Sequence, residues 1–243
     1  MDKKKIFSPL NKVKEKSKSL TSKVDFDLYD AAKLMGALPF KGLFNIDVTG
    51  LENIPETGPV ILAANHRSFM DSMFIPHVLK RRVTFVAKQE YFDSIKTRWI
   101  FKSTGQIPVR RDSANSGLGA LEAAKEVLKD GGVFVIYPEG TRTRDGFLHR
   151  GHTGVARLAL ETDATVIPVG LIGTEHVQDV HEKVPRVGKK IEVHFGKPIN
   201  VDKYKSDDDA KLVLRNLTDE IMYEIFSLSK YGYVDSYAST IPL

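Results

Sequence analysis

His66 and Asp71 are the residues whose types and spacing are best suited to catalysis. They lie in the stretch Asn65-His66-Arg67-Ser68-Phe69-Met70-Asp71. A carboxylate that accepts a hydrogen bond from one imidazole nitrogen fixes the tautomer and leaves the other nitrogen free to take a proton. The pair therefore predicts a general base with an orienting acid. The alternative is an ordinary loop histidine beside an acid that the helix dipole favours in a first turn.

The segments on either side of His66 decide whether the two side chains can meet. On one continuous helix, residues five apart would point about 140° away from each other. The apolar run 59–64 predicts a buried strand, and Ser68 with Asp71 three residues later predicts a helix start. His66 is therefore expected on a strand-to-helix turn, which can bend it back over the first turn of the helix.

The rest of the chain from residue 46 alternates short β-branched runs with helical patterns. Strands are expected over 46–48, 60–64, 83–87, 106–109, 133–137, 166–171 and 190–195. Helices are expected near 69–80, 91–103, 116–129, 153–161 and 207–229, the last with an apolar stripe of Leu212, Leu214, Leu217, Ile221 and Ile225. This order predicts an α/β fold with a mostly parallel central sheet flanked by helices. Sites in such sheets form where strands pass into loops.

Two of these loops carry groups suited to binding an anion. The first is Gly105-Gln106-Ile107-Pro108-Val109-Arg110-Arg111, in which the proline favours an edge strand. The planar guanidinium of Arg111 can bind two phosphate oxygens, whereas Arg110 is better explained as a surface arginine paired with a neighbouring acid.

The second loop is Tyr137-Pro138-Glu139-Gly140-Thr141-Arg142-Thr143-Arg144-Asp145-Gly146. Gly140 lets backbone amides approach a ligand, Thr141 offers a hydroxyl and Arg142 supplies charge. Glu139 is expected to stay ionised and to orient the arginines.

The N-terminal part has a different composition from the rest. Residues 1–24 contain eight lysines against Asp2 and Glu15, which suits either an anionic lipid surface or a solubilising tail. Residues 26–45 are apolar and aromatic but interrupted by lysine, proline and glycine, which favours a helix lying in a lipid interface over one packed on the domain. We therefore expect two parts: a basic and amphipathic membrane-associating segment, 1–45, and an α/β catalytic domain, 46–243.

The amino-acid composition excludes some kinds of site and partner. The chain has no cysteine, so thiolate nucleophiles and cysteine-ligated metals are excluded. His176, Asp179 and His181 match no zinc spacing, and no metal is expected. The formal charge of +5 suits an anionic partner, but the interior arginines lie in glycine and proline turns, so nucleic acid is not expected. The sequence contains no charge-free apolar stretch of about 18 residues, so no conventional membrane span is expected.

Four blocks of the sequence resemble the glycerolipid acyltransferase family, that of the 1-acylglycerol-3-phosphate and glycerol-3-phosphate acyltransferases. They are Asn65-His66 through Asp71, Gly105 through Arg111, Tyr137-Pro138-Glu139-Gly140-Thr141-Arg142, and Val166-Ile167-Pro168-Val169-Gly170. The blocks stand in the family's order over about residues 46–195. Tyr137 replaces the phenylalanine that is usual in the family.

The resemblance implies a specific reaction. His66 would be the base and Asp71 its orienting acid, and the acceptor hydroxyl would attack an acyl-CoA or acyl-carrier-protein thioester without a covalent acyl-enzyme. The blocks with Arg111 and with Glu139, Gly140, Thr141 and Arg142 would bind the acceptor's phosphate. From its place at the end of a strand, Lys88 could also reach this phosphate; the alternative is a solvated lysine. The block around Pro168 would form a wall near the acyl donor.

The resemblance also implies partners and a location. The expected acceptor is 1-acylglycerol-3-phosphate, with glycerol-3-phosphate, another lysophospholipid or a glycolipid as the alternatives. No cofactor beyond the acyl thioester is expected. The enzyme would be a peripheral, monotopic protein on the cytoplasmic face of the cell membrane, bound to an anionic surface. A non-catalytic lipid-binding protein with the same fold is the alternative of a different class.

Overall fold

The computed structural model of the chain describes residues 42–95, 98–103, 105–109, 116–179, 181–182, 184–205 and 209–238. Most of the predicted membrane-associating segment, residues 1–41, lies outside this part, and so does Arg111. In the described part, no helix is long and apolar enough to cross a membrane.

The described elements follow the predicted alternation of strands and helices. The strands are β1 (Asn45–Thr49), β2 (Val60–Ala64), β3 (Val83–Lys88), β4 (Ile107–Val109), β5 (Val133–Ile136), β6 (Leu148–His149), β7 (Thr165–Ile172), β8 (Lys190–Phe195) and β9 (Tyr233–Val234). The helices are α2 (Asp71–Val78), α3 (Gln89–Asp93), α4 (Arg98–Ser103), α5 (Ser116–Lys129), α6 (Gly154–Thr162), α7 (Thr174–Val177) and α8 (Ala210–Ser229), with 3₁₀ turns at Leu51–Asn53 and Asp202–Tyr204.

Seven strands form one sheet in the order β1-β8-β7-β2-β5-β3-β4. β7, β2, β5, β3 and β4 run parallel to one another, and β1 runs parallel to β8. β7 and β8 are antiparallel, so the pair β1–β8 runs against the other five strands. The predicted mostly parallel sheet is confirmed, and β4, which contains Pro108, is an edge strand as its proline suggested.

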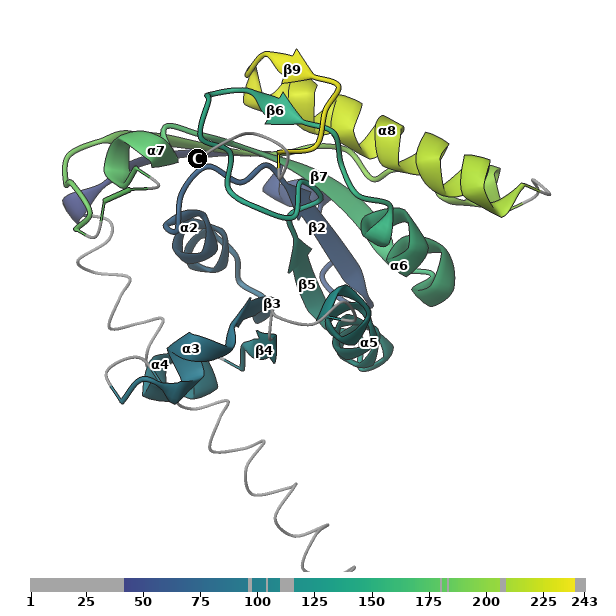
Figure 1. Cartoon of the computed structure of the whole chain (residues 1–243), viewed down its shortest axis with the longest axis horizontal. Coiled ribbons are helices and arrows are strands. Elements are labelled where there is room, and N and C mark those ends of the chain that lie inside the picture. Colours follow the sequence, from purple (N-terminus) through teal and green to yellow (C-terminus); the bar gives the residue numbers. More distant parts are fainter. Residues whose placement is uncertain are drawn as a thin grey trace, which may run out of the picture.

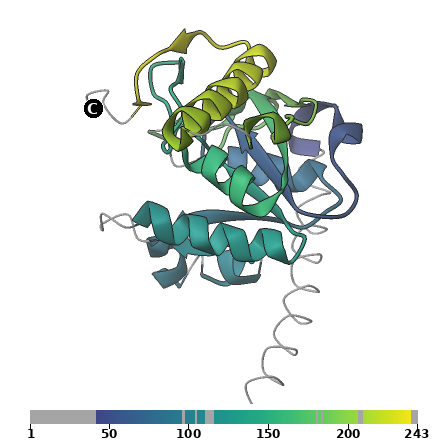
Figure 2. The same ribbon diagram turned by 90° about the vertical axis from the view of Figure 1, so that its right-hand side faces the viewer.

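Helices cover both faces of this sheet (Figures 1 and 2). In β2, Val60, Leu62 and Ala64 face a core that includes Phe74 and Ile75 of α2. Ile61 and Ala63 face the opposite core, which contains apolar side chains of α5, α6 and α8. β2 is therefore buried on both faces, which explains why it is continuously apolar.

Two helices differ from the prediction. The single helix expected over 91–103 is instead two short ones, α3 and α4, separated around Ser94. In α8, the expected stripe is shifted, because Leu212 is half exposed while Val213 is buried. The buried row starts at Val213 and continues through Leu217, Ile221 and Ile225, a strict spacing of four residues.

The described residues after α8 form part of the fold. β9 pairs in parallel with β6, and the segment around it crosses the loop that follows β5 (Figure 1). The backbone N–H of Leu148 donates to Gly232 O at 2.8 Å, and that of Arg150 donates to Ser236 O at 3.0 Å.

Candidate active site

The candidate catalytic residues lie at the carboxyl ends of neighbouring parallel strands. His66 follows β2, Glu139 and Arg142 follow β5, and Lys88 ends β3. Because β2, β5 and β3 are adjacent in the sheet, these ends meet along one edge. Thr143 N donates to His66 O at 2.9 Å, which ties the loop after β5 to the turn after β2.

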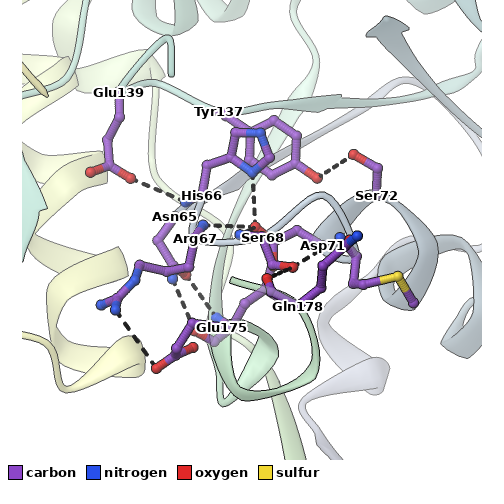
Figure 3. Close-up of polar contacts among 12 residues, drawn as sticks. Asn65, His66, Arg67, Ser68, Asp71, Ser72, Tyr137, Glu139, Glu175 and Gln178 are labelled. Atoms are coloured by element: carbon purple, nitrogen blue, oxygen red, sulfur yellow. Dashed lines mark hydrogen bonds and ion pairs between the residues drawn. The ribbon is translucent and has the colours of Figure 1, made fainter. Parts of the chain in front are cut away.

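His66 and Asp71 are in contact, as their spacing suggested. His66 Nδ1 lies 2.8 Å from Asp71 Oδ2 (Figure 3). The same oxygen accepts the backbone N–H groups of Arg67 and Ser68, each at 2.8 Å. Asp71 is the first residue of α2 and its side chain is fully buried. An oxygen that accepts three hydrogen bonds holds the proton on His66 Nδ1, so the lone pair of the imidazole lies on Nε2.

The ring of His66 is also held by an aromatic neighbour. It stacks on Tyr137 with ring centroids 3.9 Å apart and an angle of 13° between the planes (Figure 3). The hydroxyl groups of Tyr137 and Ser72 are 3.1 Å apart. Burial raises the pKa of Tyr137 well above its usual value, so the phenol stays neutral beside the imidazole. The sequence offered no sign that Tyr137 contacts His66.

Asn65 fixes the start of the turn. Its side-chain amide donates to Leu171 O at 2.9 Å, and its carbonyl oxygen accepts from Leu171 N at 2.7 Å. Both groups of one backbone position on β7 are satisfied by one buried side chain, which holds the end of β2 against β7. His66 therefore leaves the sheet at a fixed position.

Glu139 does not have the environment that was predicted. It is buried, and its two carboxyl oxygens accept the backbone N–H groups of His66 at 3.1 Å and His149 at 2.9 Å. Burial raises its pKa to about 8, although the two amides and nearby Arg67 oppose this rise. The expectation of an ionised carboxylate that orients arginines is therefore wrong, because Glu139 supports the backbone instead.

A pocket of about 240 Å³ opens beside His66. Three of the predicted phosphate-binding residues line it: Lys88, Thr141 and Arg142. Arg144, which was not predicted, lines it too. Apolar and aromatic side chains also line it: Phe69, Met73, Phe85, Val86, Ala87, Tyr91 and Phe101. The pocket thus combines a candidate base, three cationic side chains and apolar side chains.

Among the described residues, Glu139, Gly140 and Pro168 do not line this pocket. Gly140 forms a turn with φ of 73°, and a side chain there would meet the ring of His152, so glycine is needed for the turn itself. Pro168 lies within β7, in register with Ala63 of β2, so it is part of the sheet and not of the pocket wall. Arg111 falls outside the described residues. Within the described ranges, no group of three or more side chains is suited to hold a metal ion.

A family model named Acyltransferase matches residues 45–172, which is more than half of the chain. The chain therefore belongs to the acyltransferase family, and the resemblance noted in the sequence is confirmed. The match covers the strands and loops that carry His66, Lys88 and Arg142.

Individual relatives are similar to the chain over the same region. The chloroplastic 1-acyl-sn-glycerol-3-phosphate acyltransferase of Arabidopsis thaliana is 29% identical over 71% of this chain and 48% of its own length. The 1-acyl-sn-glycerol-3-phosphate acyltransferase of Borreliella burgdorferi is 32% identical over 54% of this chain and 52% of its own length. The chain thus matches about half the length of these relatives.

A solved structure has the same fold. The crystal structure of the 1-acyl-sn-glycerophosphate acyltransferase PlsC from Thermotoga maritima gives a TM-score of 0.63 at 25% identity. The alignment covers 86% of this chain and 82% of that chain, so the α/β architecture is shared over most of both proteins.

Proposed function

We propose that the chain is an O-acyltransferase that moves a fatty acyl group from a carrier thioester to the free hydroxyl of 1-acylglycerol-3-phosphate. The observation that carries this proposal is the contact between His66 Nδ1 and Asp71 Oδ2 beside a pocket lined by Lys88, Arg142 and Arg144. The relatives from Arabidopsis thaliana and Borreliella burgdorferi, both named 1-acyl-sn-glycerol-3-phosphate acyltransferases, support the same acceptor.

The base step follows from the tautomer. Nε2 of His66 removes the proton of the acceptor hydroxyl, and the resulting oxygen attacks the thioester carbonyl carbon. The C–S bond then breaks, the ester forms, and the imidazolium returns the proton to the departing thiolate. Nδ1 stays bonded to Asp71, whose negative charge stabilises the transient imidazolium. A direct attack needs no nucleophile on the protein, in keeping with a sequence without cysteine.

The pocket suits an acceptor that carries a phosphate and a chain. Lys88, Arg142 and Arg144 offer positive charge on one part of the wall, and Phe69, Tyr91 and Phe101 offer apolar surface on another. In the proposed complex the phosphate lies among the cations and positions the hydroxyl next to His66. A thioester is already an activated acyl group, so the proposed reaction uses no cofactor besides the acyl donor.

The test is a transfer assay with wild type, His66→Ala and, as the matched control, His181→Ala, an exposed histidine outside the pocket. Wild type and His181→Ala should release thiol from acyl-CoA or acyl-carrier protein only when 1-acylglycerol-3-phosphate is present. His66→Ala should lose about 10²–10⁴-fold in rate, the usual contribution of a general base. Retained turnover in His66→Ala would remove this residue from the mechanism.

A panel of acceptors separates the alternatives. Equal rates with an acceptor that lacks phosphate would favour a glycolipid-type substrate, and faster transfer to glycerol-3-phosphate would replace the proposed acceptor. Thiol release without any acceptor would indicate a hydrolase. Liposome binding without thiol release would indicate a non-catalytic lipid-binding protein.

A further inference from the structure

Arg67, the residue after the proposed base, joins the two loops of the site. Its backbone N–H donates to Asp71 Oδ2 at 2.8 Å, and its Nη1 donates to Gly146 O at 2.7 Å. Gly146 lies in the loop after β5, which also carries Thr141 and Arg142. One residue therefore connects the turn of the base with the loop that supplies the cations of the pocket.

Two residues far along the chain hold the Arg67 side chain. Its guanidinium carbon lies 4.4 Å from the ring centroid of Tyr231, and its Nη2 lies 3.8 Å from a carboxylate oxygen of Glu175. The side chains of Arg67 and Glu175 are only 12% and 15% exposed, so water screens their attraction weakly. An aromatic face and a carboxylate together fix where the guanidinium lies.

Tyr231 also holds Glu175. Its hydroxyl donates to Glu175 at 2.8 Å and accepts the backbone N–H of Gly173 at 3.3 Å. Burial, with the nearby carboxylate of Glu175, raises the pKa of Tyr231, so the phenol keeps the proton that it donates. The ring of Tyr231 contacts Arg67 directly, and its hydroxyl restrains the acid that faces Arg67.

Tyr231 comes from a part of the chain beyond the residues that match the family model, 45–172. Its backbone is anchored next to the site, because the following residue, Gly232, accepts the N–H of Leu148 at 2.8 Å. His149, the residue after Leu148, donates its N–H to Glu139, which in turn accepts the N–H of His66.

We propose that Tyr231 is a positioning residue that, through Arg67, holds the base His66 at a fixed distance from the phosphate-binding loop. This role rests on the proposed acyl transfer. Tyr231 is not among the residues that line the pocket, and its proposed effect on the rate comes from the placement of Arg67. A misplacement of about 1 Å at a reacting group can cost about 10²-fold in rate.

The test compares Tyr231→Phe, which keeps the ring over Arg67 but loses the hydroxyl, with Tyr231→Leu, which loses both. Tyr223→Leu, at an exposed tyrosine of α8, is the matched control. Tyr231→Leu should lower kcat by about 10- to 10²-fold with little change in the KM for the thioester, and Tyr231→Phe should lose less. Tyr223→Leu should keep the wild-type kcat.

Hydrogen exchange, followed by mass spectrometry, provides a measurement that does not depend on turnover. Peptides from the loops at residues 65–71 and 140–147 should exchange faster in Tyr231→Leu than in wild type, and the Tyr223→Leu control should match wild type. Tyr231→Phe, the mildest change, keeps the test valid if Tyr231→Leu does not fold.

The outcomes separate the two proposals. Unchanged kcat in both Tyr231 variants overturns the positioning role, and a lower kcat without faster exchange in the two loops overturns the route through Arg67. Absence of transfer by wild type overturns the proposed function, and the exchange data then still decide whether Tyr231 holds the two loops together.

Discussion

A single oxygen of Asp71 organises the turn that carries His66. Oδ2 accepts hydrogen bonds from the imidazole and from the N–H groups of Arg67 and Ser68, all at 2.8 Å. Because two of these donors belong to the backbone, the carboxylate fixes the path of the turn and the orientation of the ring together. The proposed base is therefore arranged before a substrate binds, which would avoid a cost of reorganisation during the proposed reaction.

Glu139 provides a prediction for the pH dependence of stability. Its pKa is raised from an ordinary 4.5 to about 8 by burial, so in this interval the folded state holds a proton that the unfolded state has released. The contribution of Glu139 to the free energy of unfolding is therefore complete below pH 4.5 and decreases as pH rises to about 8, by on the order of a few kcal/mol.

Urea unfolding at several pH values across this interval provides the measurement. Glu139→Gln does not titrate, so the stability difference between wild type and this variant should shrink as pH rises. The amide also presents an N–H group to one of two backbone donors, so Glu139→Gln should be less stable than wild type at low pH. A difference that stays constant, or grows with pH, would contradict the raised pKa.

The sequence predicted the residues of the site that belong to short local motifs. They include the His66 and Asp71 pair, Lys88, Thr141 and Arg142, which lie where the neighbouring parallel strands β2, β3 and β5 end. The contacts of Tyr137 and Arg67 were missed, since each joins residues more than 70 positions apart. Local spacing carries no information on which distant side chains will meet.

At the level of elements, α8 gives a direct comparison between the predicted and the observed face. The helix begins after Asp209, whose side chain accepts the N–H groups of Lys211 and Leu212. This start sets Leu217 inside the core, fully buried, and leaves Leu212 50% exposed. The expected stripe contained both residues. A leucine shows that a position is apolar, but it does not show whether other elements bury that part of the helix surface.

Leu217→Ala and Leu212→Ala therefore form a matched pair. Leu217→Ala should lower the free energy of unfolding by about 2–5 kcal/mol through loss of burial and the cavity left behind. Leu212→Ala should change it by no more than about 0.5 kcal/mol, as is usual for exposed positions. Urea unfolding measures both changes. Equal losses of unfolding free energy would contradict the observed difference in burial and support the apolar stripe expected from the sequence.

For the whole molecule, the sheet shows that an alternation of strands and helices in the sequence does not predict the direction of every strand. The order of strands and helices predicted a mostly parallel sheet, and five strands follow it. β8 instead runs antiparallel to β7 after a connection without a long helix, and β1 joins it at the edge. A connection whose described helix is as short as α7 does not fix the direction of the next strand, whereas a crossover helix does.

We propose that the whole protein is a peripheral membrane protein on the cytoplasmic face of the cell membrane. Residues 1–24 carry eight lysines and two acids, and each lysine near an anionic surface adds about 1 kcal/mol at low salt. Deletion of residues 1–24 should weaken co-sedimentation with vesicles rich in anionic lipid. The full chain should show the same loss when salt is raised or neutral vesicles are used.

The deletion variant should keep the unfolding transition of the full chain. Identical vesicle binding with and without residues 1–24 at low salt would exclude these lysines as the anchor. Residues 26–45 would then be the candidate anchor.

The pairing of β6 with β9 has a consequence for biosynthesis. The ribosome adds the two residues of β6 long before those of β9, with which they pair. The interval between Arg67 and Tyr231 is longer still. While the ribosome is still adding the last helix, the nascent protein already contains every residue of the pocket but lacks the strand and the ring that restrain them. Under the proposed role of Tyr231, the final arrangement of the site forms only after translation has passed Val234.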